Sequence, residues 1–308
     1  MATIDLEKML DKVKASQWAL ADIDWEAPGA ELITEEQWPK LRDFMIDLVW
    51  IEHVGARGFA AMAKGAPNET LRQLYTYFYA EEQRHANAEM ALMKRWGMLE
   101  GDKLPEPNNN IRLAVAWMQS NADDMPYHVM GTVIPALEVA LDGALCQFLL
   151  DSVDDPVCHE VFAKINDDES RHLGVGFTVM EMHGHSPQSI EAVRMIGRIF
   201  KPATLLGLAV HFPLLNKMRD NVIKAGLPEE KLYAAMAKFE KIGGRTPGGR
   251  NNPLFRAISK HAQIMADRNQ TFYHRPVDLM VKLTDMIPEW ALPAKPSWVG
   301  DVTWKPTD

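Results

Sequence analysis

The chain has 308 residues, 47% of them apolar, and a formal net charge of −9, which allows a sizeable core in one large domain or two small ones. Because the charge is negative and no basic block occurs, we expect neither nucleic acid nor a membrane as a partner. The N-terminus lacks the apolar stretch of a signal peptide, and no run is long enough to span a bilayer.

Four long helices are expected in the first 183 residues, arranged as two hairpins. Their approximate bounds are 36–63, 70–95, 126–151 and 156–182. Thr34 and Gln37 have the spacing of a capping box at the start of the first helix, and Gly97 ends the second. A crossover rich in Pro and Asn, with a short helix near 111–121, separates the hairpins. Two hairpins joined by a long crossover are typical of one kind of four-helix bundle.

The remaining segments also show helical spacing, and no strand pattern stands out. One such segment, at about 4–21, precedes the bundle. Five segments follow the bundle, at about 188–200, 202–224, 228–242, 253–270 and 277–287. The Gly-rich segment 243–249 lacks the Gly-Lys-Ser/Thr ending of a phosphate-binding loop, so we expect a linker there. The sequence predicts a single all-α domain over 1–308, with a bundle core at 36–183 and a C-terminal helical extension at 184–308 packing on it.

One pattern of potential metal ligands occurs twice. Each copy is a lone Glu followed 30 or 31 residues later by Glu-x-x-His, and the residues are Glu52, Glu82 and His85, then Glu138, Glu169 and His172. Residues three apart share a helix face, and the hairpin spacing returns the second Glu to the level of the first. Four carboxylates balance the charge of two divalent ions, whereas so many buried acids would be costly alone. The pattern predicts a two-metal site within the bundle.

The residues beside these ligands also repeat. An acid precedes each Glu of the Glu-x-x-His motifs, and an Arg precedes each His. Metal-bound imidazoles usually donate their second N–H to a carboxylate. We therefore expect Asp168 to orient His85 across the bundle and Glu81 to orient His172. The arginines expected to pair with these acids are Arg84 and Arg171.

The doubled motif, E-x(about 30)-[DE]-E-x-R-H, resembles that of the ferritin-like di-iron carboxylate superfamily, in its oxygenase and ribonucleotide-reductase-like branch. The match covers roughly residues 36–183. It implies a ferritin-like fold, two Fe ions with O2 as co-substrate, and a reductase or ferredoxin that delivers electrons. A Mn/Fe pair, as in ligand-binding oxidases similar to the reductase subunit, stays open. In such proteins the oxidant hydroxylates, N-oxygenates or desaturates a substrate, or generates a radical.

Several features favour substrate oxidation over the other activities of such a site. More than 100 residues follow the last ligand and could enclose a pocket for a small, largely apolar or aromatic substrate. Radical-generating subunits of the resembling family carry a Tyr one turn after the first ligand His, where this chain has Glu89. We therefore expect an O2-dependent monooxygenase or oxidase. A ferroxidase or iron-handling protein is the alternative.

Some residues keep two interpretations. Glu89 and Asp142 each lie one turn beyond a ligand and could be extra ligands, proton carriers, substrate anchors or solvent-facing acids. His211 has apolar neighbours in sequence and could cover the bundle. The chain has only two cysteines, Cys146 and Cys158, and such low cysteine content is typical of a reducing cytoplasm, where we expect the protein. The sequence also allows one disulfide between them. A homodimer would suit so helical a chain.

Overall fold

The computed structural model describes residues 4–99, 101, 103–183 and 202–296, and within these it leaves out the side chains of 136–147 and a few others. Every regular element in the described residues is a helix, which confirms the expected all-α class. No helix of the described part is long and apolar enough to cross a membrane.

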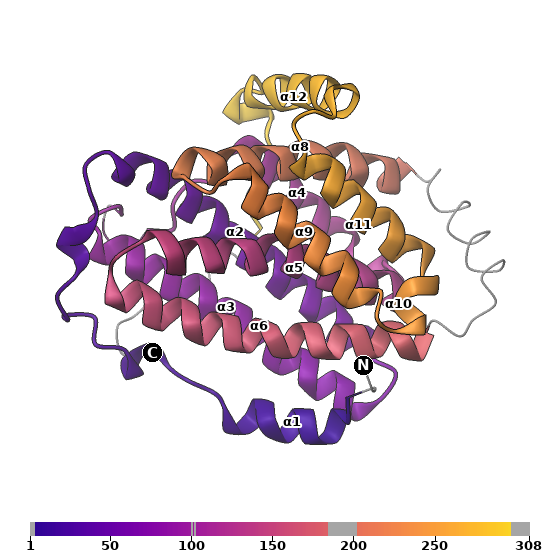
Figure 1. The fold of residues 1–308 in the computed structure, drawn as a ribbon. Helices are drawn as coiled ribbons and strands as arrows, with labels where there is room; N and C mark the ends of the chain where they lie inside the picture. Colours follow the sequence, from indigo (N-terminus) through magenta and orange to yellow (C-terminus); the bar gives the residue numbers. More distant parts are fainter. Residues whose placement is uncertain (1–3, 100, 102, 184–201, 297–308) are drawn as a thin grey trace.

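Four long helices form two packed hairpins at the centre of the molecule (Figure 1). They are α2 (Gln37–Gly65), α3 (Glu69–Arg95), α5 (Tyr127–Ser152) and α6 (Pro156–His183). Helix α2 packs along α3 and α5 along α6, while α2 also contacts α5 and α3 contacts α6. The arrangement is the four-helix bundle with one long crossover that the sequence predicts.

Local sequence signals explain where these helices begin and end. Thr34 and Gln37 exchange side-chain and backbone hydrogen bonds at 3.1 and 3.2 Å, which forms the expected capping box. The Asn68 side chain accepts from the backbone N–H of Leu71 at 2.9 Å and starts α3. Gly97 follows α3 with a φ of 67°, a left-handed conformation that favours glycine.

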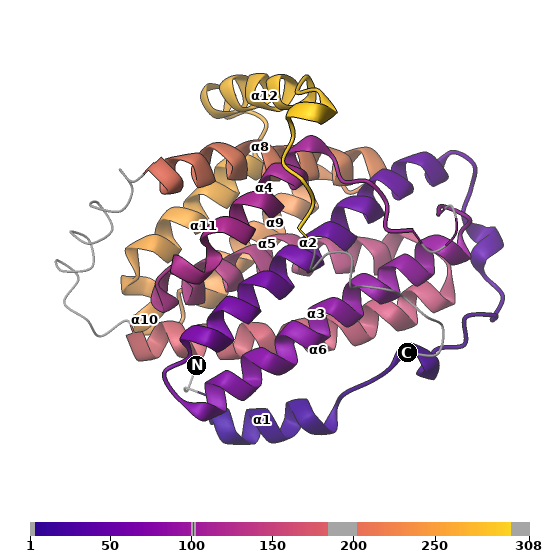
Figure 2. The ribbon, with the colours of Figure 1, turned by 180° about the vertical axis from the view of Figure 1, so that it is seen from behind.

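The other helices cover the bundle from two sides (Figures 1 and 2). On one side, α1 (Leu6–Ala15) packs on α3 and α6. On the other, helix α4 of the crossover (Asn109–Asn121) contacts α2 and α8. Helices α9 and α11 lie on α5, and α10 lies on α6. The C-terminal helices are α8 (Pro202–Ala225), α9 (Glu229–Gly243), α10 (Pro247–Asn251), α11 (Pro253–Ala266) and α12 (Thr271–Asp285).

Two expectations for the C-terminal part were wrong in detail. Part of the Gly-rich segment 243–249 is helical, because Thr246 caps α10 by accepting from the Gly249 N–H at 3.2 Å. A Cβ at Gly248 would lie 2.5 Å from the Cα of Glu181, so its glycine permits close contact with α6. The last helix begins at Thr271 rather than 277. The helix expected at 188–200 lies outside the described residues.

Large apolar side chains fill the bundle interior. Trp50, Tyr75, Phe78 and Phe162 are all fully buried. The indole N–H of Trp50 donates to the carbonyl of Pro105 at 2.8 Å, so burial leaves no polar atom of this ring unsatisfied. Such packing fixes the helices relative to one another, and with them the polar groups that lie between them.

Candidate metal centre

Acids and imidazoles from α2, α3 and α6 converge at one level of the bundle. The side chains of Glu52, Glu82, His85, Glu169 and His172 are each at most 4% exposed. One donor atom from each of the first four lies within 4.8 Å of the others. The hairpin geometry explains this, since α2 and α3 run antiparallel and bring Glu52 back to the level of Glu82.

The two imidazoles face the carboxylates through the same ring nitrogen. Nδ1 of His85 lies 3.3 Å from Glu52 Oε2 and 3.2 Å from Glu169 Oε1. Nδ1 of His172 lies 3.2 Å from Glu82 Oε1 and 3.3 Å from Glu169 Oε2. Glu169 therefore lies between the two rings, with one oxygen directed to each.

These donors suit a shared cation. Nδ1 of His85, Oε1 of Glu82 and both carboxylate oxygens of Glu169 are buried, yet they make no hydrogen bond with the described residues. Buried polar atoms rarely lack a hydrogen-bond partner, because each unsatisfied atom lowers the stability of the fold. Nitrogen and carboxylate oxygens that converge without hydrogen bonding have the arrangement of ligands around a transition metal. The residues present therefore fit a metal site.

The sixth expected ligand is described only in part. Glu138 lies on α5, the helix that completes the bundle, but its side chain is outside the described residues. The same holds for Asp142 and Cys146. Cys158 is a free, buried thiol. Glu138 thus stays a predicted ligand on the strength of its spacing.

The outer nitrogens of the two rings contact acids from the opposite hairpin. Nε2 of His85 lies 3.0 Å from Asp168, and Nε2 of His172 lies 2.9 Å from Glu81. These are the pairs expected from the sequence. Each contact favours the N–H on Nε2 and directs the lone pair of Nδ1 inward, as a ligand requires.

Two arginines neutralise these outer acids. Arg84 lies 3.1 Å from Asp168 and 3.6 Å from Glu81, and Arg171 pairs with the same two carboxylates. The pairs cross between α3 and α6, so they also join the two hairpins. The positive charges of the two arginines cancel the negative charges of Asp168 and Glu81. The negative charge of the inner carboxylates must therefore be balanced by a cation or by protons bound between them.

Two further residues belong to this network and were not expected from the sequence. Gln17 donates to Glu81 at 2.6 Å, and the Trp18 indole donates to Asp168 at 2.8 Å. The Arg84 guanidinium lies 4.8 Å above the Trp18 ring. Both residues belong to the segment between α1 and α2, which carries no ligand spacing, so nothing in the sequence alone linked them to the centre.

Proximity of so many charges shifts the pKa values. Burial raises the pKa of Glu52, and burial together with the charges of Glu52 and Glu169 raises that of Glu82 further. Burial also acts on Glu169, but the neighbouring imidazoles outweigh it and lower its pKa to about 2. For both imidazoles, burial is outweighed by the surrounding carboxylates, which raise the pKa of His85 and His172 well above the ordinary value. Without metal, the centre holds protons on its imidazoles.

Glu89 faces the centre rather than solvent. It is 1% exposed, one turn beyond His85 on α3, and its Oε2 has no hydrogen bond with the described residues. Burial raises its pKa well above the ordinary value, and the negative charges of Glu52, Glu82 and Glu169 act in the same direction. The solvent-facing interpretation is therefore wrong, and the surroundings of Glu89 favour its neutral, protonated form.

Two glycines permit close packing at this level. A Cβ at Gly55 would lie 2.0 Å from Glu82 Oε2, so this glycine of α2 makes room for the carboxylate. At Gly176 a Cβ would lie 2.3 Å from the Pro135 side chain, so that glycine permits close approach of α5 and α6.

Aromatic rings close one side of the centre. The ring centroids of Phe78 and Phe59 lie 4.2 and 5.0 Å from that of His172. Tyr75 stacks on Phe59, and its hydroxyl accepts a hydrogen bond from Tyr127 at 3.0 Å. These apolar rings exclude water from the imidazole and lower the local polarity.

Several other histidines of the described residues contact groups outside the cluster. His53 packs edge-on against Trp50, and burial lowers its pKa to about 4. His211 lies on α8 beside His261, 6.0 Å between ring centroids. The ring of His159 contacts the carbonyl of Val153. These contacts fit ordinary polar and packing interactions.

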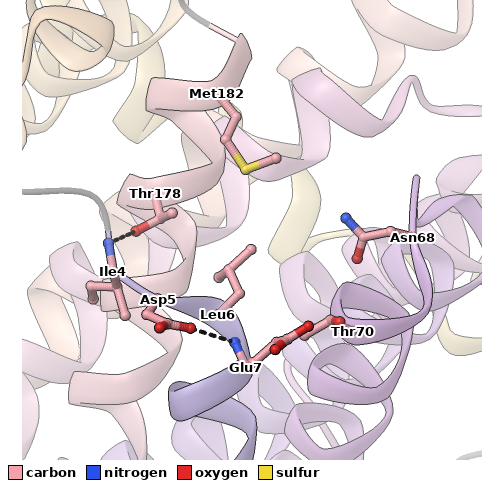
Figure 3. Close-up of a pocket in the computed structure, with 8 residues that line it drawn as sticks. All are labelled: Ile4, Asp5, Leu6, Glu7, Asn68, Thr70, Thr178 and Met182. Atoms are coloured by element: carbon pink, nitrogen blue, oxygen red, sulfur yellow. Dashed lines mark hydrogen bonds between the residues drawn. The ribbon is translucent and has the colours of Figure 1, made fainter.

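A surface pocket lies beside the N-terminal end of α1 (Figure 3). Within it, the backbone N–H of Ile4 donates to Thr178 at 3.2 Å, and Asp5 caps α1 by accepting from Glu7 at 3.1 Å. None of its eight lining residues belongs to the acid and imidazole cluster. We assign it no part in the chemistry of the centre.

Comparison with known proteins identifies the fold. No protein-family model and no curated protein matches the chain. A solved structure of a mutant R2-like ligand-binding oxidase, with an aerobically reconstituted Fe/Fe cofactor, matches 91% of this chain and 93% of its own. The TM-score is 0.50 and the sequence identity is 14%. At this identity the match establishes a ferritin-like fold and nothing more. It does not show that this chain has the ligands or the activity of the matched protein.

Proposed function

We propose that this chain is an O2-dependent, non-haem di-iron oxidase or monooxygenase that acts on a small, largely apolar or aromatic substrate. One observation carries the proposal: buried carboxylates and two imidazoles converge at one level of a ferritin-like bundle, and Nδ1 of His85, Oε1 of Glu82 and both oxygens of Glu169 make no hydrogen bond with the described residues. The fold shared with an R2-like oxidase that holds an Fe/Fe cofactor supports iron as the metal.

The ligand assignment follows from the geometry and the spacing. Glu52 and His85 would hold one ion mainly, and Glu138 and His172 the other. Glu169 has one oxygen directed to each imidazole, which suits a bridging carboxylate. Glu82 would bridge as well, since it shares α3 with His85 yet lies 3.2 Å from His172. Two iron ions held by these residues would supply redox chemistry with O2 for oxidation of a substrate.

The chain's own groups prepare that chemistry. Asp168 and Glu81 hold both imidazoles in one tautomer with the lone pair directed inward. The rings of Phe59 and Phe78 keep water from the centre and would contact an apolar substrate. Glu89 holds a proton beside the ligands, where it can donate a hydrogen bond. Each turnover needs external electrons, so we propose a reductase or ferredoxin as the partner.

Metal loading is the first test of this proposal. Protein incubated with Fe(II) without oxygen should bind about two ions per chain. A Glu169→Gln variant should lose most of that capacity, whereas Glu160→Gln, an exposed acid on the same helix, should keep it. Fewer than one ion bound per wild-type chain would contradict the proposal.

Exposure to O2 then separates oxidation of a substrate from iron handling. The proposal expects consumption of O2 that depends on a reductant and on an added aromatic or apolar compound, with an oxidised product detected by mass spectrometry. A growing ferric mineral core without substrate oxidation would instead indicate a ferroxidase. Metal analysis after loading with both metals distinguishes an Fe/Fe from a Mn/Fe centre.

A further inference from the structure

The outward face of α12 is apolar. Five large side chains on or just after this helix are the most exposed large apolar side chains of the described residues: Phe272 at 70%, Leu279 at 56%, Leu283 at 57%, Met286 at 77% and Trp290 at 88%. The first four have spacings of seven, four and three residues, which place them on one stripe of the helix. Figures 1 and 2 show α12 above α8, at the outer edge of the molecule.

The inward face of α12 carries both apolar and polar side chains: Val277 is 4% exposed, and Tyr273 is partly buried against the core. Asn216 of α8 donates to Asp278, Lys217 pairs with Asp285 at 2.7 Å, and Arg219 contacts His274 at 3.3 Å. A helix on the surface of a globular protein usually has the opposite orientation, with its apolar stripe against the core. The body therefore holds α12 by Val277 and Tyr273 as well as by polar contacts, and the described residues leave the outward apolar stripe uncovered.

The same outward face is positively charged. Arg275 and Lys282 are exposed on the apolar stripe, and neither has an ion pair with the described residues. All three acids in 271–290 are paired: Asp278 with Arg268, Asp285 with Lys217, and Glu289 with Arg112. A chain with a net charge of −9 thus presents an apolar ridge with two cations along the outward face of α12.

We propose that α12 docks on an anionic phospholipid surface, with its apolar stripe among the acyl chains and Arg275 and Lys282 beside the lipid phosphates. A second copy of the chain fits less well, because a symmetric contact would set the same cations against each other. The ridge is convex, so a protein partner would need a matching groove, whereas a lipid layer deforms around it. The net charge of the whole chain argued against a membrane, but it says nothing of the two exposed cations on this stripe.

Vesicle co-flotation of the full chain tests the proposal. The wild-type protein should float with vesicles of phosphatidylglycerol and phosphatidylcholine, bind much less to pure phosphatidylcholine, and dissociate as salt is raised. The variant L279S/L283S/M286S should lose binding by about tenfold or more, since each side chain removed contributes to the transfer free energy. R275Q/K282Q should weaken binding and remove most of its salt dependence.

Matched variants guard against general effects of the substitutions. L32S/M182S/Y233S removes three half-exposed apolar residues elsewhere, and K238Q/K260Q removes two exposed lysines of α9 and α11; both should bind vesicles like the wild type. Circular dichroism checks that each variant is folded. Equal binding by L279S/L283S/M286S would overturn the proposal. The proposal would also be overturned if the wild-type protein did not bind vesicles. If the wild type were then a dimer in solution and L279S/L283S/M286S a monomer, a second copy of the chain would be the partner of this face.

Discussion

At the scale of single residues, the centre depends on groups that no metal would touch. Asp168 contacts His85, Trp18 and two arginines, and it is 1% exposed. Its burial raises the pKa, but these partners more than compensate and lower it below the ordinary range. The carboxylate is therefore charged, and it holds the imidazole ready as a ligand.

Asp168→Asn should weaken iron binding by about 10- to 100-fold, because an amide supports the required tautomer of His85 less well than a carboxylate does. Equilibrium titration with Fe(II) under nitrogen measures the change. Asp167→Asn, an exposed neighbour on the same helix, serves as the control and should leave the affinity unaltered. Equal affinities in the two variants would show that Asp168 does not position the ligand.

Glu89→Gln should leave iron affinity within about twofold of the wild type. Four ligand carboxylates already balance two divalent ions, so a fifth inner acid stays neutral, and Gln preserves that neutrality. A loss of tenfold or more would instead identify Glu89 as a ligand. The folded-state pKa of Glu89 is raised, so the wild type loses stability as pH rises through that pKa. Denaturation of metal-free protein at rising pH should show a smaller loss in the variant.

At the scale of helices, glycines set how closely the ligand-bearing elements approach. Gly55 on α2 faces the Glu82 carboxylate of α3, and Gly248 of α10 lies against the α6 backbone. A methyl group at either place would meet another atom closer than van der Waals contact allows. The helix spacing and the carboxylate positions therefore depend on one another.

Gly55→Ala should displace the Glu82 carboxylate, lower metal occupancy and cost about 1–3 kcal/mol of unfolding free energy. Gly65→Ala is the matched control, since a Cβ there would have no neighbour nearer than 3.7 Å. That variant should be as stable as the wild type or slightly more so, because alanine favours the helix. Metal analysis and urea denaturation of both proteins measure these effects, and full occupancy in the Gly55 variant would refute the expected clash.

At the scale of the whole molecule, the centre couples metal binding to protons and to stability. The raised pKa values of His85 and His172 mean that the metal-free fold binds protons more tightly than the unfolded chain does. That contribution is fully present below the unfolded value of 6.5 and is lost as pH rises through the folded pKa. Metal must displace these protons, so binding should release them.

Two measurements check this coupling. Unbuffered metal-free protein should acidify on addition of Fe(II), and its melting temperature should fall as pH is raised above 6.5. Loaded protein should keep its stability over that range, with a gain of about 2.7 kcal/mol when free metal is one hundred times the dissociation constant. Parallel pH dependences for the two forms would show that the imidazoles do not hold these protons.

The sequence alone determined the helical class, the bundle and the pattern of acids and imidazoles that brings Glu52, His85 and Asp168 together. Spacing of three along a helix, and of about 30 across a hairpin, dictates which side chains share a face and a level, so the contacts of His85 with Glu52 and Asp168 could be predicted. The periodicity of the sequence shows which residues share a helix face, but it does not show which other segment packs against that face. Only the tertiary structure could join Gln17 and Trp18 to the outer acids, bury Glu89, place Gly55 against Glu82, and turn the apolar stripe of α12 outward, because each depends on contacts between segments that no local pattern relates.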